Sequence, residues 1–235
     1  MKSVLARLKK ELDKFSDLKQ AKILQGFFKT GKGEYGEGDI FLGIKVPEQR
    51  KVAIKFFEEL FLEDLEKLLK SKIHEYRMSA LLILIKQYEK ADEKYKKEIY
   101  NFYLKNTKNI NNWDLVDISA PKIAGDHLLN KPRSILYKLA KSENLWERRI
   151  AIISTFAFIR NNEFTDTLKI SKMLLKDKHD LIHKATGWML REVGKRDQKI
   201  EEEFLKKYYL KMPRVMLRYA IEKFEERKKK FYLEK

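Results

Sequence analysis

Apolar residues recur three and four positions apart along almost the whole chain, which is the period of amphipathic helices. One such stripe contains Val4, Leu5, Leu8, Leu12 and Phe15. No segment alternates regularly between apolar and polar residues, so strands are not expected. The pattern predicts helices over 2–15, 17–29, 48–58, 62–70, 74–89, 92–106, 112–119, 121–128, 132–141, 145–160, 164–176, 179–195, 197–210 and 213–230.

Residues suited to a first helical turn mark several of these starts. Proline is tolerated there because its missing N–H costs little. The prolines at predicted starts are Pro47, Pro121, Pro132 and Pro213. Asp, Asn and Ser commonly cap helix N-termini. The capping candidates are Asp92, Asn112, Ser142 and Asp197.

The predicted helices follow one another in pairs with a period of roughly 35–45 residues, the range of HEAT-type repeats. A helix pair cannot bury its own apolar face, so antiparallel pairs are expected to stack as an all-α solenoid with a concave surface. No linker divides the chain, and residues 1–235 are predicted to form a single domain.

Two segments interrupt the helical rhythm. The segment 30–46 contains Gly31, Gly33, Gly36, Gly38 and Gly43 and is predicted to be a long loop. The segment 228–235 begins with three lysines and is predicted to be a frayed, solvated helix end that can also touch phosphate.

The composition narrows the class of protein. The 235 residues include 52 Lys and Arg against 35 Asp and Glu, a formal net charge of +17, which favours nucleic acid or acidic membrane as a partner, although solvated lysines also account for it. No stretch approaches the ~18 apolar residues of a membrane span, and no secretory signal begins the chain. Without cysteine there is no disulfide and no thiolate metal site. A cytoplasmic monomer without cofactor is expected.

Two motifs match known patterns only by spacing. Gly31-x-Gly33-x-x-Gly36 resembles a dinucleotide fingerprint, but it follows a predicted helix instead of a strand, so a flexible lid or phosphate-binding loop is favoured. His179 and His183 lie one helical turn apart, as metal ligands do. They lack the glutamate and the third ligand of a hydrolytic zinc site, so no metal is predicted.

The segment Asn111–Asp117 is the first that suggests chemistry. Trp113 and Asp117 are four residues apart and share one helical face, whereas Asp114 and Leu115 point elsewhere. A carboxylate beside an indole suits a cationic or sugar-bearing ligand. The alternative is a core tryptophan, with Asp117 paired to an arginine of the next repeat.

The other two tryptophans also have charged neighbours. Trp146 precedes the adjacent arginines Arg148 and Arg149. Trp188 follows Gly187, which allows another group to approach the helix backbone closely, and it shares a face with Arg191. Scattered core indoles would account for the same pattern.

Four stretches match a known family in order along the chain. They are Phe41-Leu42-Gly43-Ile44 followed by Pro47 and Arg50, Trp113-Asp114-x-Val116-Asp117, Trp146-x-x-Arg149-x-Ala151-Ile152, and Lys184-Ala185-x-Gly187-Trp188-x-Leu190-Arg191-Glu192. On these residues the sequence resembles the AlkD-type DNA alkylation repair family, the HEAT-like-repeat DNA glycosylases. The resemblance runs from about residue 20 to the last predicted helix.

The resemblance implies hydrolysis of the N-glycosidic bond of cationic N3- or N7-alkylated purines in double-stranded DNA. It implies Asp117 as the catalytic carboxylate, Arg149 as its neighbour and DNA contact, and Trp113 and Trp188 as an aromatic pair at the lesion deoxyribose. It also implies that the base leaves without being enclosed. The residues expected to contact DNA are Arg148, Lys184, Arg191, Arg214, Arg218, Phe27 and Lys29.

Two departures from the family pattern lie near the N-terminus. Phe27-Phe28-Lys29 stands where relatives have Tyr-Met-Lys, and Gly31–Gly38 is an insertion. Some relatives of this fold bind DNA without removing a base. A non-catalytic protein that binds damaged or branched DNA is therefore the second hypothesis, and a HEAT-type protein–protein scaffold is the third.

Overall fold

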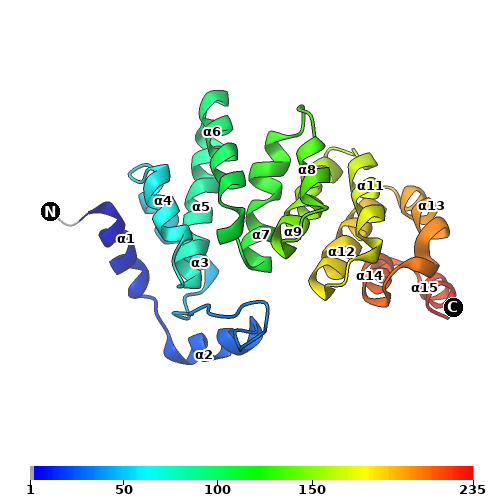
Figure 1. Cartoon of the computed structure of the whole chain (residues 1–235), viewed down its shortest axis with the longest axis horizontal. Helices are drawn as coiled ribbons and strands as arrows, with labels where there is room; N and C mark the ends of the chain where they lie inside the picture. The colour runs from blue at the N-terminus through cyan, green and yellow to red at the C-terminus, as the bar shows by residue number, and fades with distance from the viewer. Residues whose placement is uncertain (1–2, 235) are drawn as a thin grey trace. The chain divides into compact units, whose positions relative to one another are not determined.

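The computed structural model describes residues 3–234, and within this range the regular structure is helical, without a strand (Figure 1). The predicted all-α class is confirmed. The α helices are α1 (Val4–Asp13), α2 (Leu18–Phe27), α3 (Val46–Phe56), α4 (Leu62–Leu69), α5 (His74–Lys90), α6 (Glu93–Lys105), α7 (Trp113–Ser119), α8 (Ser134–Leu139), α9 (Leu145–Ser154), α10 (Phe156–Arg160), α11 (Thr165–Met173), α12 (Asp180–Arg196), α13 (Gln198–Tyr208), α14 (Arg214–Ala220) and α15 (Glu226–Leu233). None of these described helices is long and apolar enough to cross a membrane.

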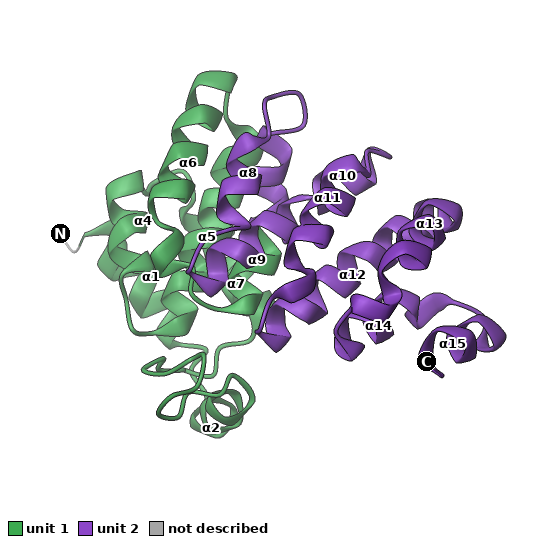
Figure 2. Ribbon diagram, turned by 45° about the vertical axis from the view of Figure 1, so that its right-hand side comes forward, with its two compact units in different colours: residues 1–119 green, residues 120–235 purple. Residues whose placement is uncertain are grey.

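The chain divides into two compact units, coloured separately in Figure 2. Unit 1 ends at Ser119 and contains α1 to α7, and unit 2 begins at Ala120 and contains α8 to α15. The single domain, the solenoid and its concave surface stay predictions.

Unit 1 is built around α5, which is buried on nearly all sides. Helices α3, α4, α6 and α7 pack on it, and α1 packs on α3. The run from Met78 to Ile85 is wholly buried, because apart from Ser79 it is apolar and therefore suits an interior position. On α1, Leu8 and Leu12 are buried as their spacing predicts, but Phe15 stays exposed because α1 ends at Asp13.

Unit 2 is built around α12, against which α9, α11, α13 and α14 pack. The prediction that Gly187 allows a close approach is confirmed, and the group that approaches is α14. A Cβ at Gly187 would lie 2.4 Å from the Met216 carbonyl oxygen and 2.6 Å from the Tyr219 Cβ. Any side chain at this position would therefore push α14 away from α12.

Two predicted helices are each broken into two. The span 145–160 divides at Thr155, whose hydroxyl donates to the Ile152 carbonyl at 2.7 Å. The span 213–230 divides at a 3₁₀ turn and extended Phe224, so α14 and α15 are separate. The tail prediction was wrong in part. The lysine run lies inside α15, where Tyr232 is buried and Lys228 pairs with Glu202.

The helix-start signals were correct in some places and wrong in others. Asp92 and Asp197 cap α6 and α13, and Pro47 lies in the first turn of α3. The prediction for Ser142 was wrong: Asn144 caps α9, because its side chain accepts from the Trp146 N–H. Pro132 was also misplaced, since α8 begins two residues later. Pro121 opens a π-helical turn, Pro121–Gly125, where an α-helix was expected.

The predicted loop over 30–46 is confirmed up to Lys45, after which α3 begins. Its glycines are required at particular points. Gly43 has a φ of 81°, and a Cβ there would lie 2.1 Å from the Asp17 carbonyl oxygen, so the loop passes directly over the start of α2.

Candidate functional site

Unit 1 contains a cavity of about 710 Å³ between α2, the segment before α3, the first turns of α5, and α7. Aromatic rings form much of its wall, with Phe27 at the end of α2 and Phe28 directly after it facing Trp113 from α7. Asp114 and Asp117 also line the cavity. Aromatic faces together with carboxylates suit a ligand that is cationic or develops positive charge.

The rings in this wall form a continuous stack. Phe28 lies between Phe41 and Trp113, with ring centroids 5.0 and 5.2 Å away and nearly parallel planes. Phe41 stacks in turn on the His74 imidazole at 4.5 Å. The stack fixes the plane of the Trp113 indole, because one of its faces is covered by a buried ring.

Behind the stack lies a buried network of charged side chains. The two nitrogens of His74 lie 3.3 Å from Asp39 Oδ2 and 2.8 Å from Asp114 Oδ2. Arg77 donates to the same Asp39 oxygen at 2.6 Å, and Asn112 lies 3.3 Å from it. This Asp39–His74–Asp114 network connects the glycine-rich loop, α5 and the first turn of α7.

Burial and pairing act in opposite directions on the pKa values in this network. Burial lowers the pKa of His74, but the carboxylates of Asp114 and Asp39 outweigh it and leave the pKa raised. Burial raises the pKa of Asp39, yet His74 and Arg77 outweigh it, so the pKa is lowered. Two cations and two carboxylates thus offset one another in a water-poor site.

Another buried carboxylate holds the Phe41–Ile44 segment in place. Glu75 is buried, and it accepts hydrogen bonds from the N–H groups of Leu42, Gly43 and Ile44 at 3.0, 2.8 and 3.2 Å. Three consecutive N–H groups therefore converge on one side chain of α5. Phe41, and with it the ring stack, is held by this arrangement.

The predicted pair on α7 lies at the cavity, as its spacing indicates. Trp113 and Asp117 are both partly exposed and both line the cavity. Leu115 is buried, but the expectation that Asp114 points elsewhere was wrong, because Asp114 lines the same cavity and pairs with His74. Burial, with a contribution from the Asp117 charge, raises the pKa of Tyr103, whose hydroxyl pairs with Ser119.

In unit 2, the adjacent arginines of α9 have structural partners. Arg148 donates to the Asp177 carboxylate at 2.6 Å and to the carbonyl groups of Ser142 and Glu143. Arg149 is buried, and it donates to the Leu181 carbonyl at 2.5 Å. Both guanidinium groups are anchored within unit 2, and the expected contacts of Arg148 and Arg149 with DNA stay predictions.

The predicted residues of α12 lie close together. The Trp188 indole N–H donates to Glu192 at 3.1 Å, and its ring lies 5.9 Å from that of Phe156. Arg191 pairs with Glu192 and with Glu222 of the turn after α14. Trp146 is buried, which agrees with the alternative that this tryptophan is a core residue.

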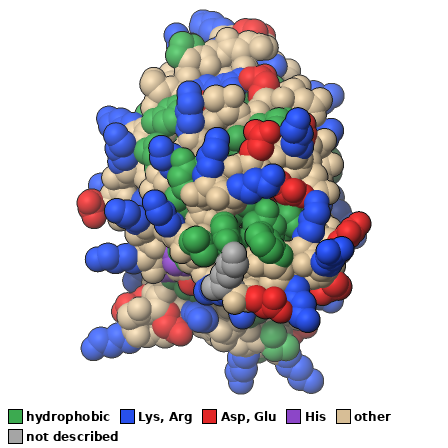
Figure 3. Space-filling model, turned by 90° about the vertical axis from the view of Figure 1, so that its right-hand side faces the viewer, with side chains coloured by type: hydrophobic (Ala, Val, Ile, Leu, Met, Phe, Trp, Pro, Cys, Tyr) green, Lys and Arg blue, Asp and Glu red, His purple; other side chains and the backbone are tan. Residues whose placement is uncertain are grey.

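The remaining basic residues lie at the surface or near it. Lys184 pairs with Asp180 at 2.6 Å, and Arg214 donates to the Leu233 carbonyl. Arg214 and Arg218 are exposed on α14. On the face shown in Figure 3, Lys and Arg side chains are spread widely with Asp and Glu side chains among them.

The two histidines with metal-like spacing have local hydrogen-bonding roles. His179 caps α12 by accepting from the Leu181 N–H at 3.1 Å, and His183 lies 2.6 Å from the Asp177 carbonyl oxygen. Among residues 3–234, no three His, Asp or Glu side chains form a group that could hold a metal ion.

A family model for DNA alkylation repair enzymes matches residues 8–224. The chain belongs to the DNA alkylation repair enzyme family. Stretches that carry the resemblance, such as Phe41–Ile44 and Trp113–Asp117, lie in this region. No curated protein sequence matches the chain.

Solved structures of low sequence identity share the fold. A predicted DNA alkylation repair enzyme from Enterococcus faecalis is 18% identical with a TM-score of 0.71, over 90% of this chain and 97% of that one. AlkD2 from Streptococcus mutans is 17% identical with a TM-score of 0.56, over 88% and 98%. The protein smu.31 from Streptococcus mutans UA159 is 19% identical with a TM-score of 0.55, over 77% and 93%.

The catalytic residues that the sequence predicts are divided between the units. Trp113 and Asp117 belong to unit 1, and Arg149 and Trp188 belong to unit 2. Sequence reasoning missed the buried network and Glu75. One signal was present in the sequence. The apolar run in α5 follows His74, Glu75 and Arg77 directly, which indicates that this polar first turn is buried as well.

Proposed function

We propose that the protein is a DNA glycosylase that hydrolyses the N-glycosidic bond of cationic N3- or N7-alkylated purines in duplex DNA. The observation that carries this proposal is the placement of Trp113 and Asp117 at one cavity whose wall combines aromatic rings and carboxylates. Membership in the DNA alkylation repair enzyme family supports it.

The chemistry follows from the charge of the substrate. Alkylation at N3 or N7 makes the purine cationic and a good leaving group, and its departure gives the deoxyribose oxocarbenium character. An ionised Asp117 near C1′ lowers this barrier electrostatically or positions the attacking water. The aromatic system of the Trp113 indole attracts the same developing charge. Of the expected residues in unit 2, Trp188 is assigned to the lesion deoxyribose and Arg149 to contact with the DNA.

This mechanism limits the range of substrates. Asp117 stabilises positive charge on the sugar, but the proposal includes no acid that protonates a neutral leaving base. Enzymes that enclose an extruded base can supply such groups in their pocket. We therefore expect neutral lesions to remain in the DNA, whereas cationic lesions are released.

Phosphate binding is assigned to exposed or partly exposed cations. Arg191, Arg214, Arg218 and Lys184 of unit 2 and Lys29 of unit 1 neutralise phosphates in this proposal, so affinity falls as salt rises. Arg148 is given a supporting role, because its partners hold α9 to the segment before α12.

Incubation with methylated duplex DNA and identification of the released bases by mass tests the activity. We expect free 7-methylguanine or 3-methyladenine, unchanged by EDTA because no metal takes part. A reaction that EDTA abolishes would contradict the metal-free mechanism and return attention to His179 and His183. The absence of any released purine, with DNA binding retained, would reject the glycosylase assignment.

A non-catalytic protein that binds damaged or branched DNA is the second candidate. It is favoured by Phe27, which stands where relatives have a tyrosine and therefore lacks a hydroxyl contact. The glycine-rich loop next to Phe27 is also an insertion. The same assay separates the two functions, since only the first produces free purine.

A further inference from the structure

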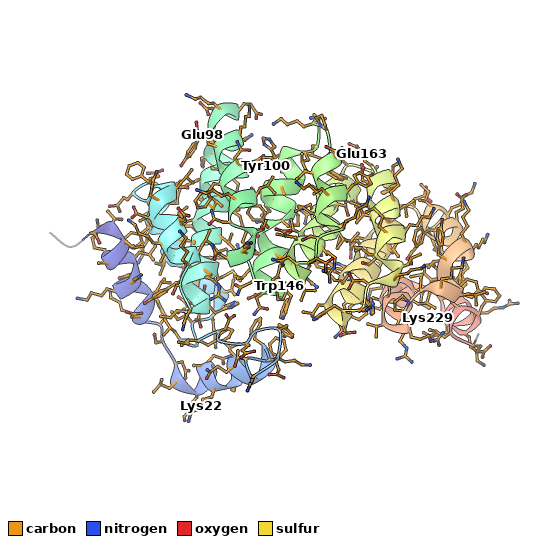
Figure 4. The ribbon with its side chains drawn as sticks, viewed as in Figure 1. Lys22, Glu98, Tyr100, Trp146, Glu163 and Lys229 are labelled. Carbon is orange, nitrogen blue, oxygen red and sulfur yellow. The ribbon has the colours of Figure 1, made fainter. Side chains whose placement is uncertain are left out.

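The imidazole of His74 reaches two different parts of unit 1 from the first turn of α5. Its Nδ1 lies 3.3 Å from Asp39 in the glycine-rich loop, and its Nε2 lies 2.8 Å from Asp114 in the first turn of α7. Helices α5 and α7 pack on each other, and side chains fill the interior of unit 1 around them (Figure 4). Only 3% of the His74 side chain is exposed, so its effect on a ligand passes through these two partners.

The two partners of His74 differ in what else holds them. Asp39 also accepts from Arg77 at 2.6 Å, so it stays paired without the imidazole. Asp114 has no such second partner, because His74 is the only side chain among residues 3–234 that bonds to it. The Nε2 bond is therefore the one for which the network offers no substitute.

Helix α7 carries both unit 1 residues that are proposed to act on the lesion nucleotide. It has seven residues, with Trp113 at its start and Asp117 about one turn later. Asp114 links the backbone of this helix to α5, since one carboxylate oxygen accepts from the Leu115 N–H at 2.8 Å and the other faces His74. A helix of two turns moves as one body, so a shift of its first turn displaces Trp113 and Asp117 together.

The charges around His74 favour donation from both ring nitrogens. The charged groups that face it are the carboxylates of Asp114 and Asp39 and the guanidinium of Arg77. Burial lowers the pKa of His74, but the two carboxylates outweigh burial and Arg77, so the pKa is raised. A doubly protonated imidazole donates from Nδ1 and Nε2 at once. The Phe41 ring, stacked on the imidazole at 4.5 Å, holds its plane toward both acceptors.

We propose that His74 is a positioning residue for base release: its Nε2 donates to Asp114 and thereby holds α7, with Trp113 and Asp117, in the place that the reaction requires. The bond from Nδ1 to Asp39 contributes to stability but not to this placement. The inference rests on the proposed function for the reaction, whereas the placement of α7 is measured without it.

Two neutral substitutions at His74 separate its two bonds. The amide nitrogen of glutamine takes the place of Nε2, and that of asparagine takes the place of Nδ1. His74→Gln therefore keeps a donor for Asp114 and His74→Asn keeps one for Asp39, while both lose the ring and its charge, so each variant is the control for the other.

Purine release from methylated duplex DNA is measured in single turnover at saturating protein. We expect the rate of His74→Gln to stay within about threefold of the wild-type rate and that of His74→Asn to fall by about 10- to 10²-fold, as a misplacement of reacting groups by about 1 Å does. The two variants should have the same affinity for DNA and similar midpoints of thermal unfolding.

The indole of Trp113 reports the place of α7 without any reaction. In the nuclear magnetic resonance spectrum of protein labelled with ¹⁵N-tryptophan, its resonance is identified by its loss in Trp113→Phe. We expect this resonance to move in His74→Asn and to keep its wild-type position in His74→Gln. If the His74 variants do not fold, Asp114→Ala removes the same bond at a partly exposed position and should reproduce both effects of His74→Asn.

The outcomes separate this inference from the proposed function. Equal rates for His74→Gln and His74→Asn would overturn it, and so would a faster His74→Asn, which would assign the placement to the loop. Unequal rates with the Trp113 resonance unmoved in both variants would overturn it as well. A wild-type protein that releases no purine, with the resonance moved only in His74→Asn, would reject the glycosylase and leave the placement by His74 intact.

Discussion

Units 1 and 2 each bury an acidic side chain near a helix, but they do so in opposite ways. In unit 1, Asp39 is ionised and paired with His74 and Arg77. In unit 2, Glu201 is buried on α13, and no described group bonds to its Oε1. Burial, with Glu202 nearby, raises the pKa of Glu201 to about 9, against a smaller opposing effect of Arg191. The charge of Asp39 is stabilised by pairing, whereas Glu201 avoids a buried charge by keeping a proton.

The surplus charge is divided unequally as well. Residues 1–119 contain 24 Lys and Arg against 19 Asp and Glu, and residues 120–235 contain 28 against 16. The net charges are therefore +5 and +12. Under the proposed function, unit 1 supplies an aromatic and acidic cavity, and unit 2, with the larger net positive charge, supplies more of the attraction for phosphate.

The largest effect is expected when the buried network of unit 1 is broken. His74→Ala leaves Asp114 and Asp39 without their shared cation, and it should lower the free energy of unfolding by about 3–5 kcal/mol, measured by urea denaturation. Since the pKa of His74 is raised, its stabilising contribution is full below about pH 6.5 and is lost as pH rises through the folded value. The deficit should therefore shrink at alkaline pH.

A double-mutant cycle controls this prediction. Asp114→Asn combined with His74→Ala should cost less than the two single costs together, because each variant removes the same interaction. Additive costs would show that the network is not coupled.

The next largest effects are expected at Asp114 and Asp117 of α7, and they should differ between the two residues. Asp117→Asn should reduce base release by about 10²–10³-fold while DNA binding persists. Asp114→Asn should instead lower the midpoint of thermal unfolding, since Asp114 pairs with His74. Wild-type release by Asp117→Asn would reject the catalytic role of that carboxylate.

In unit 2, the protonated Glu201 should make the free energy of unfolding depend on pH, and Glu201→Gln should remove this dependence. Because the folded pKa is about 9 and the ordinary value is 4.5, the free energy of unfolding falls as pH rises from about 5 to 9. One proton limits the slope to about 1.4 kcal/mol per pH unit. Denaturation of wild-type protein and variant across this range measures it, and parallel curves would contradict a protonated Glu201.

The smallest effect is expected at the cationic surface. Arg218→Ala should reduce the slope of log affinity against log salt by about one, with little change in stability. Arg148→Ala should instead lower the stability and leave the salt slope nearly unchanged, because Arg148 is anchored to Asp177. DNA titrations over a range of salt, paired with thermal unfolding, distinguish these roles. If Arg148→Ala lowers the salt slope and Arg218→Ala does not, Arg148 is the phosphate contact and Arg218 is not.

Local patterns in the sequence predicted local structure well. The spacing of Trp113 and Asp117 was sufficient to place both on one face of α7, because four residues make about one helical turn. Asp92 and Asp197 mark helix starts for the same reason: a cap depends only on the next three residues. Ser142 misled because Asn144, two residues later, is a competing cap.

The buried network could not be predicted from spacing. His74 is 35 residues from Asp39 and 40 residues from Asp114, and no periodicity connects them. Their meeting depends on the packing of α5 against α7 and on the path of the glycine-rich loop. The break at Thr155 was missed because the apolar period continues across it. The helix divides where the Thr155 hydroxyl donates to the Ile152 carbonyl.

Glu75 has a consequence for protein engineering. Its carboxylate holds three successive peptide groups that precede it by more than thirty residues. A short peptide that carries Phe41–Ile44 therefore lacks the side chain that shapes it, and a graft of α7 alone lacks the rings that orient its indole. Transplantation to another helical scaffold requires the loop, α5 and α7 to be moved together.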